Sequence, residues 1–320
     1  MSQPTVLVLA GGPDAEREVS LAGGKAIAAA LERGGEWRGH LAPVDRLTLD
    51  ELRTLPGDVI FPVLHGPFGE GGGLQRVLEA DGRPYVGSRA VASRIAIDKV
   101  LTKSVAGSLG MDVLPTALLD PADDTLAMAL PVVVKPVFEG STIGLHICDA
   151  HHAWEAAHRA SAALGKPCMI EPAVQGRELT VGLLDSGRGL EPLPIIEIEP
   201  ADGLYDYEAK YARNDTGYTV EPAIPEQVAA TMREKTLSLA AAIGVRHLCR
   251  ADFILDEDNR PWFLEINTMP GFTDHSLVPM AAEHAGLDLA ALTTRLATLA
   301  EAEGDAHEQD VQDKEELSQH

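Results

Sequence analysis

The sequence has few cysteines and few basic residues, and it has no long apolar run. Its three cysteines, Cys148, Cys168 and Cys249, lie far apart and form no C-x-x-C pair, so we interpret them as buried thiols in a reducing compartment. The 26 basic residues stand against 49 acidic ones, which argues against nucleic acid as a partner because phosphate contacts need clustered lysine and arginine. No apolar run approaches the roughly 20 residues that span a bilayer. No basic and apolar leader precedes the first strand, so we expect a cytoplasmic protein without membrane insertion.

The hydropathy pattern predicts several domains. A chain of 320 residues is longer than one core usually serves, and a hydrophobic content of 45% excludes global disorder. In residues 1–97, continuous apolar strands at 5–10 and 58–64 alternate with helices at 19–33 and 74–80. Strands of this kind are buried on both faces, so the first segment is predicted to be a parallel α/β sheet.

The remaining segments are richer in strands. Residues 98–176 begin with a helix near Asp98, followed by predicted strands at 131–136, 145–148 and 168–171 and a helix at 153–164. Residues 177–303 contain strands at 178–184 and 193–199, a polar loop at 203–219, a long helix at 225–243, two strands ending at Leu255 and Ile266, and two closing helices. The last stretch, 301–320, holds eight acidic residues and one lysine. We therefore predict a disordered acidic tail over 304–320.

A lysine and a glycine-bearing loop form the first candidate ligand site. Lys135 ends the strand V-V-V-K-P, and the loop Gly140-Ser141-Thr142-Ile143-Gly144 follows five residues later. Backbone N–H groups beside glycine can approach phosphate oxygens, and the lysine adds a point charge. A hairpin turn beside an exposed lysine explains the same pattern, and no Walker loop occurs in the sequence.

Acidic residues in two apolar strands form the second candidate site. Asp252 lies in A-D-F-I-L, and Glu265 and Asn267 lie two residues apart in W-F-L-E-I-N, so the latter two share one face of a strand. Buried carboxylates are costly unless neutralised, and oxygen ligands of this kind suit Mg²⁺. Arg250 lies on the same face as Asp252, so a structural ion pair is the alternative interpretation.

Residues after the first two apolar strands are weaker candidates. His65 ends the second strand and is followed by Gly66 and Glu70, at the strand end where ligands collect in open α/β sheets. A loop histidine that only makes a structural hydrogen bond is the alternative. Gly11-Gly12 follows the first strand, but the G-x-G-x-x-G pattern of dinucleotide-binding folds is absent.

Taken together, the chain resembles D-alanine–D-alanine ligases of the ATP-grasp superfamily over about residues 5–300. The matching segments are A-E-R-E-V-S at 15–20, H-G at 65–66, G-E at 69–70, D-K at 98–99, V-K-P at 134–136, G-S-T-I-G at 140–144, G-R-E at 176–178, Y-D-Y-E-A-K-Y at 205–211, R-A-D at 250–252, L-E-I-N-T-M-P-G at 264–271 and H-S-L at 275–277. One departure is Gly71, which stands where the family loop H-G-x-x-G-E-D-G has an aspartate.

The resemblance implies three domains and an acidic tail. The N-terminal parallel α/β domain (1–97) would precede the two-domain ATP-grasp fold (98–176 and 177–303), with the nucleotide between two β-sheets. The implied activity joins two D-alanines at the expense of ATP, through a D-alanyl phosphate, for peptidoglycan precursor synthesis. The implied partners are D-alanine, ATP as co-substrate and two Mg²⁺, with Mn²⁺ as a substitute. A homodimer is also implied by the family.

The resemblance also implies roles for individual residues. Those implied in catalysis are Glu16, Ser141, Tyr211, Arg250, Gly271 and Ser276. Those implied to bind the amino-acid substrates are Glu16, His65, Lys210, Arg250, Gly271, Ser276 and Leu277. Those implied to bind ATP are Lys99, Lys135, Glu139, Gly140, Ser141, Thr142, Glu171, Pro172, Val174, Glu178 and Lys210. Those implied to hold the metal ions are Asp252, Glu265 and Asn267.

Three alternative functions remain at this stage. A related ATP-grasp ligase would make a D-alanyl ester or another D-amino-acid product, although Tyr211 in an intact Y-E-A-K-Y segment favours the peptide. A nicotinamide dehydrogenase fits only the first segment and lacks its glycine fingerprint. A nucleotide-binding module without catalytic activity would need Lys135 but could lose Asp252, Glu265 or Lys210, and all three are present.

Overall fold

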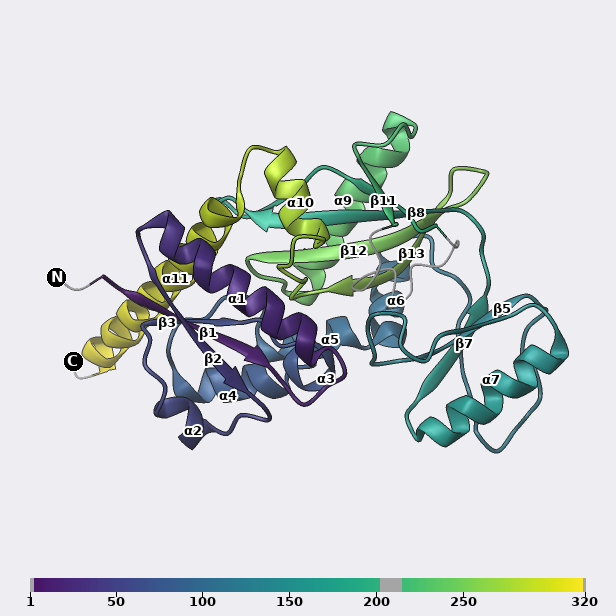
Figure 1. Ribbon diagram of the computed structural model, residues 1–320, viewed down its shortest axis with the longest axis horizontal. Helices are drawn as coiled ribbons and strands as arrows, with labels where there is room; N and C mark the ends of the chain where they lie inside the picture. The colour runs from purple at the N-terminus through teal and green to yellow at the C-terminus, as the bar shows by residue number, and fades with distance from the viewer. Residues whose placement is uncertain (1–2, 202–214, 319–320) are drawn as a thin grey trace.

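The structure is a computed structural model that describes residues 3–201 and 215–318. Its described residues form a mixed α/β protein with one parallel and two antiparallel sheets (Figure 1). The parallel sheet has the order β2-β1-β3 and comprises β1 (Thr5–Gly11), β2 (Arg38–Val44) and β3 (Val59–Pro62). Its surrounding helices are α1 (Arg17–Gly34), α2 (Leu49–Arg53), α3 (Gly66–Gly69) and α4 (Gly73–Asp81). The predicted parallel α/β sheet in the first segment is confirmed.

The second sheet is antiparallel, with the order β4-β7-β5-β6. Its strands are β4 (Ala117–Leu118), β5 (Val132–Pro136), β6 (His146–Cys148) and β7 (Cys168–Pro172). Helix α7 (His151–Leu164) packs on one face, where Trp154 and Ala157 meet Val132 and Val134 in a small core. Two helices, α5 (Ala90–Ile97) and α6 (Lys99–Ser108), connect the first sheet to the second.

The third sheet is also antiparallel and has the order β11-β10-β8-β12-β13, with β9 paired to β8. Its strands are β8 (Arg177–Asp185), β9 (Leu190–Pro192), β10 (Ile196–Glu199), β11 (Gly217–Val220), β12 (Leu248–Leu255) and β13 (Pro261–Asn267). Helix α9 (Glu226–Ile243) shares a core with one face, and α10 (Leu277–His284) shares a core with the other. The loop predicted over 203–219 ends in β11, and its residues 203–214 lie outside the described part of the chain.

The last helix, α11 (Leu289–Ser318), extends into the segment predicted to be a disordered acidic tail. The backbone is helical as far as Ser318, and disorder of 304–320 stays a prediction. The segment contains no proline, and most of its residues after Gly304 have unbranched side chains that lose little freedom in a helix. The first half of α11 shares a core with α1 and β3, in which Leu292 and Leu296 are fully buried.

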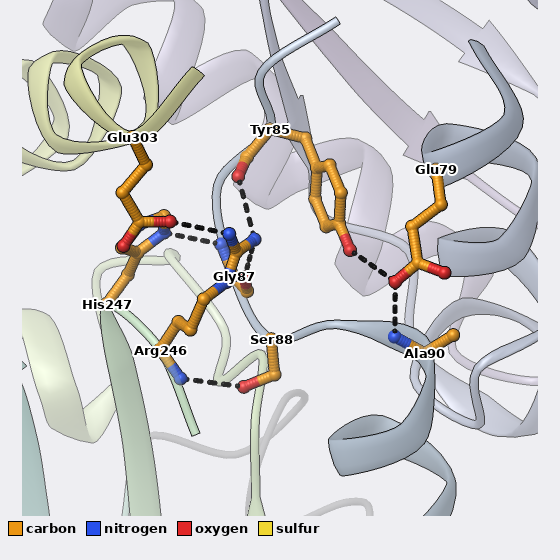
Figure 2. Close-up of polar contacts among 8 residues, drawn as sticks. All are labelled: Glu79, Tyr85, Gly87, Ser88, Ala90, Arg246, His247 and Glu303. Atoms are coloured by element: carbon orange, nitrogen blue, oxygen red, sulfur yellow. Dashed lines mark hydrogen bonds and ion pairs between the residues drawn. The ribbon is translucent and has the colours of Figure 1, made fainter. Parts of the chain in front are cut away.

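A polar cluster joins the start of β12 to the first sheet and to α11. The Arg246 guanidinium donates to the Gly87 carbonyl at 2.7 Å and pairs with Glu303 at 2.5 Å. The Gly87 N–H donates to Nδ1 of the fully buried His247 at 2.9 Å, and Nε2 of that ring lies 3.3 Å from Glu303 (Figure 2). We call Arg246, His247, Glu303 and Gly87 the clamp. It ties the beginning of the strand that carries Arg250 to the loop that leads into α5.

The clamp and the α11 core predict where the chain can be shortened. A variant that ends after Gly304 keeps Leu292, Leu296 and Glu303, so we expect its thermal unfolding midpoint to equal that of the full chain. A variant that ends after Leu299 loses Glu303 and leaves Arg246 without its carboxylate, which costs about 2 kcal/mol or more. Calorimetry on both variants checks this, and equal midpoints for the two would contradict the stabilising role of the clamp.

Candidate active site

An open pocket collects most of the predicted site residues. The loops after β1 and β3, the loop between β5 and β6, strand β13 and the segment before α10 all contribute to its wall. The predicted residues that line it are Glu16, His65, Lys99, Glu139, Gly140, Ser141, Arg250, Glu265, Asn267, Gly271, Ser276 and Leu277. Residues separated by more than 200 positions in the chain therefore meet in one pocket.

Glu16 and Ser141 join two distant loops inside the pocket. Glu16 precedes α1, Ser141 lies between β5 and β6, and both residues are at least nine-tenths buried. The Ser141 hydroxyl donates a short hydrogen bond to the Glu16 carboxylate. Ser141 and Thr142 both have positive φ, 50° and 63°, which turns the loop back toward Glu16. An acidic acceptor is thereby fixed beside the loop that was predicted to cover phosphates.

His65 and Glu70 form a buried pair on the same side of the pocket. The Nδ1 atom of His65 lies 2.8 Å from the Glu70 carboxylate, and Nε2 has no hydrogen-bond partner within the described chain. Burial lowers the pKa of His65, but the hydrogen bond and charge of Glu70 outweigh it, so the pKa is raised above its usual value. The ring therefore holds a proton readily and directs a second nitrogen away from Glu70.

Glu265 and Asn267 share one face of β13 as their spacing predicted, and the structure places Asp252 of β12 opposite Glu265. Arg250 faces Asn267 two positions along the same ladder. Both Arg250–Asp252 nitrogen–oxygen distances are 2.8 Å, and Thr180 donates to Asp252 at 2.7 Å. Glu265 pairs with Lys99 at 3.0 Å.

These residues fit a divalent cation by the chemistry of their donor atoms. Two carboxylates and the amide oxygen of Asn267 on one face of a ladder are the hard oxygen ligands that Mg²⁺ prefers. Within the described chain, no three acidic, histidine or cysteine side chains are grouped for a metal, and both carboxylates have cationic partners. The ion pair of Arg250 with Asp252, left open as the alternative, is therefore present.

A second charged cluster lies between the second and third sheets and is almost fully buried. Glu171 on β7 accepts from Lys103 of α6 at 2.6 Å and from Lys135 of β5 at 2.8 Å. Thr116 donates to the same carboxylate at 2.8 Å, and Lys103 also donates to the Phe263 carbonyl on β13 at 3.2 Å. We call Lys103, Lys135 and Glu171 the buried triad. Burial would raise the pKa of Glu171, but the two lysines hold it below its usual range.

Comparison with known proteins identifies the family. The family model described as D-ala D-ala ligase C-terminus matches residues 121–298. The chain is 39% identical to the D-alanine–D-alanine ligase of Nitrosomonas europaea over 298 residues, which covers 92% of this chain and 96% of that one. It is 42% identical to the ligase of Dechloromonas aromatica, with 92% and 97% of the two chains covered.

The chain belongs to the D-alanine–D-alanine ligase family. Solved structures agree with this in fold. The D-alanine–D-alanine ligase of Coxiella burnetii superposes with a TM-score of 0.84 at 22% identity over the whole of both chains. The ligase of Bacillus anthracis, complexed with ATP, gives a TM-score of 0.80 at 25% identity and covers 96% of this chain and all of that one. The family resemblance stated from the sequence is confirmed.

Some residues that the ligase resemblance implied lie outside the pocket. Thr142, Lys135, Glu171, Pro172, Val174, Glu178 and Asp252 do not line it. Pro172 is the last residue of β7, Val174 lies between β7 and β8, and Glu178 is the second residue of β8. This segment connects the second sheet to the third. Lys210 and Tyr211 lie outside the described residues.

The conformation of the loop around Gly71 explains why this position has glycine where the ligase motif has aspartate. A Cβ atom at position 71 would lie 2.3 Å from the Pro67 carbonyl oxygen. The conformation of this loop therefore requires glycine, and the aspartate of the family motif does not fit it.

Three residues to which sequence reasoning gave no role lie in the pocket or in the buried triad. Glu70 lines the pocket as the partner of His65, and His275 lines it beside Ser276. Lys103 belongs to the buried triad. Its one sequence signal is its position four residues after Lys99 in a helix, which places both lysines on one face of α6.

Proposed function

We propose that this protein is an ATP-dependent D-alanine–D-alanine ligase that supplies the dipeptide for peptidoglycan. The proposal rests on one observation: the amino-acid site and the phosphate site must be adjacent, and the residues implied for both line a single pocket. These residues are Glu16, Ser141, His65, Lys99, Arg250 and Glu265. In the first step, the carboxylate of one D-alanine attacks the γ-phosphorus of ATP and displaces ADP. In the second, the amine of another D-alanine attacks the acyl phosphate carbonyl, and the tetrahedral intermediate expels phosphate while the amine loses a proton.

Glu16 would bind the ammonium group of the first D-alanine, with His65 beside it. Its carboxylate is buried and already fixed by Ser141, so it offers a preorganised acceptor. Arg250 and the N–H of Gly271 would stabilise the oxyanion of the tetrahedral intermediate, where charge develops. Both residues line the pocket.

Ser276 and Leu277 would bind the carboxylate of the second D-alanine. Ser276 is the N-cap residue of α10 and Leu277 is its first residue, so their backbone N–H groups lie at the positive end of the helix. The Ser276 hydroxyl makes no hydrogen bond to the N–H groups of the first helical turn, and it accepts from the Thr273 N–H at 2.8 Å. It also lies 3.0 Å from the Thr273 hydroxyl, and when Thr273 is the donor in that pair, the Ser276 proton can be donated to a carboxylate.

The nucleotide would lie between the second and third sheets. Lys99 and Lys135 would hold its phosphates, the loop from Glu139 to Thr142 would cover them, and Glu171, Pro172, Val174 and Glu178 would line the adenine and ribose site. Asp252, Glu265 and Asn267 would hold two Mg²⁺, or Mn²⁺ in their place, which offset the charge of the phosphates. For Lys210 we propose the substrate- and ATP-binding role, and for Tyr211 the catalytic role, that the family resemblance implies.

The organisation proposed with this function follows the three sheets. It comprises an N-terminal domain of residues 1–97, a central domain of 98–176, a C-terminal domain of 177–303 and the acidic end of the chain. We propose that the protein acts as a homodimer in the cytoplasm. Among the described residues, no helix has the length and apolar character needed to cross a membrane.

A related ligase with a different second substrate is the alternative. A D-Ala:D-Ser ligase of Enterococcus faecalis shares the fold with a TM-score of 0.77 at 22% identity, covering 93% of this chain and all of that one. A coupled assay for ADP release separates the possibilities. We expect release with D-alanine and a D-alanyl-D-alanine product, and little release with D-lactate as the acceptor or with no amino acid. Equal turnover with D-lactate would favour the ester-forming alternative, and no release with D-alanine would refute the proposal.

Removal of the Ser141 hydroxyl tests the link between the two loops. Ser141→Ala leaves the buried Glu16 carboxylate short of one hydrogen bond, which costs about 1–3 kcal/mol. A loss of this size in transition-state stabilisation corresponds to roughly a five- to 150-fold decrease in kcat/KM for D-alanine, which is the result we expect. Ser161→Ala, at a buried serine of α7 outside the pocket, is the matched control and is expected to retain activity. Equal activity in both variants would remove Ser141 from the mechanism.

A further inference from the structure

The buried triad carries one more positive charge than a structural ion pair needs. Two ammonium groups share the single Glu171 carboxylate, and Lys103, Lys135 and Glu171 are only 3%, 9% and 1% exposed. Moving a second cation out of water costs several kcal/mol unless another anion compensates it. A further carboxylate whose charge acts on Lys103, that of Glu265, is already paired with Lys99. The region therefore has an unmatched positive charge that an anionic ligand can satisfy.

The two lysines are held differently. Lys103 has a second bond, to the Phe263 carbonyl, so it is anchored to β13 as well as to Glu171. For Lys135, Glu171 is the one ion-pair partner within the described chain. Lys135 can therefore leave the carboxylate more easily than Lys103 can.

We propose that Lys103 is a positioning residue for nucleotide binding: it neutralises Glu171, so that Lys135 can leave this carboxylate and bind the phosphates of ATP. The inference rests on the proposed function, because the ligand it invokes is the nucleoside triphosphate of that reaction. Lys103 itself does not touch the nucleotide in this scheme. It keeps the site cationic when ATP arrives and keeps Glu171 paired after Lys135 has moved.

The electrostatics of the triad agree with this assignment. Burial, followed by repulsion from Lys135, lowers the pKa of Lys103 to about 8. Two cations held this close repel one another, and a phosphate chain that draws Lys135 away relieves the repulsion. If the triad served only the stability of the fold, one lysine would neutralise Glu171, and the second lysine would add repulsion without further neutralisation.

The test is a set of variants whose ATP affinity is measured by calorimetry without D-alanine. In Lys103→Met, Glu171 keeps Lys135 as its only lysine, so we expect the Kd for ATP to rise at least tenfold. At saturating ATP, kcat and the KM for D-alanine should stay within about threefold of the wild type. The control Lys235→Met removes a lysine whose one hydrogen bond within the described chain is to the Leu109 carbonyl just after α6, at 2.8 Å, and it should leave the Kd unchanged.

A double variant separates the loss of the Lys103 charge from the trapping of Lys135. Lys103→Met/Glu171→Gln removes the carboxylate that would trap Lys135 and retains the Glu171 backbone, through which the proposed adenine contacts run. Lys135 is then buried without a carboxylate, so we expect a lower unfolding midpoint in the absence of ATP. We expect this variant to bind ATP about tenfold more tightly than Lys103→Met, and ATP to raise its unfolding midpoint by more.

The outcomes separate the inference from the function on which it rests. If the wild type binds ATP and Lys103→Met binds it equally well, or if the double variant binds ATP as weakly as Lys103→Met, the role of Lys103 is refuted and the ligase proposal stands. If the wild type binds no ATP, both are refuted. If kcat at saturating ATP falls while the Kd is unchanged, Lys103 acts in the chemical step and the positioning role is wrong.

Discussion

Replacement of Glu265 by glutamine is expected to decrease ADP formation by about three powers of ten or more. The glutamine keeps the size of the side chain but removes one charge from a face where Asp252 and Asn267 would supply the other oxygen ligands of the proposed Mg²⁺ site. The same change removes the partner of Lys99, which lies 3.0 Å from Glu265, so the nearby phosphate site is also disturbed. Initial rates measured across a range of Mg²⁺ concentrations check the prediction.

Glu197→Gln is the matched control for this experiment. Glu197 lies on β10 of the same sheet, is largely buried, and pairs with Arg177 at 2.6 Å away from the pocket. We expect this variant to lose stability but to retain its turnover. A Glu265→Gln enzyme with normal turnover at ordinary Mg²⁺ would overturn the metal assignment and leave the residue as the structural partner of Lys99.

Replacement of Arg250 by lysine is expected to decrease kcat about 100- to 1000-fold, the usual effect of removing one oxyanion donor. Lysine keeps the positive charge beside Asp252, so the fold is preserved. It loses the planar pair of donors that holds Asp252 at two distances of 2.8 Å in the wall of the pocket.

The two interpretations of Arg250 predict different results in this variant. If the residue serves only the ion pair with Asp252, Arg250→Lys should lower the unfolding midpoint and leave kcat unchanged. Arg177→Lys is the matched control, because Arg177 on the neighbouring strand also donates two hydrogen bonds to one carboxylate, that of Glu197. It measures what the replacement of arginine by lysine costs in such a pair outside the pocket. A similar kcat in Arg250→Lys and Arg177→Lys would contradict the oxyanion role.

Continuous apolar strands were the part of the fold that the sequence revealed best. Residues 6–10 are fully buried between helices on both faces, so their sequence is apolar throughout and the strand could be predicted. Strand β2 (Arg38–Val44) was not predicted, because it lies at the edge of the sheet, pairs only with β1 and carries mixed polar residues. Strand β11 was missed for the same reason, since it is the edge of the third sheet.

The site was predictable where a motif carries it, and less so where its geometry depends on distant contacts. Glu16, Ser141 and Ser276 were identified from their motifs, and all three line the pocket. Lys103 and Glu70 were not, because each becomes noteworthy only through a partner that the fold brings to it. For Asp252, the strand pattern favoured a metal ligand and left an ion pair as the alternative, because Arg250 two residues earlier shares its face. The structure shows the ion pair, while the metal role stays a prediction.

The packing of α11 on α1 and β3 has a consequence for the order in which the protein can fold during synthesis. The ribosome makes the first sheet early, but Leu292 and Leu296, which cover Ile27 and Leu31 in the same core, are made near the end. At about 5–20 residues per second, the apolar side of α1 stays uncovered for on the order of ten seconds or more. The N-terminal segment therefore cannot complete its core while it is being synthesised. It depends on the last helix to do so, and until then it is a surface to which chaperones can bind.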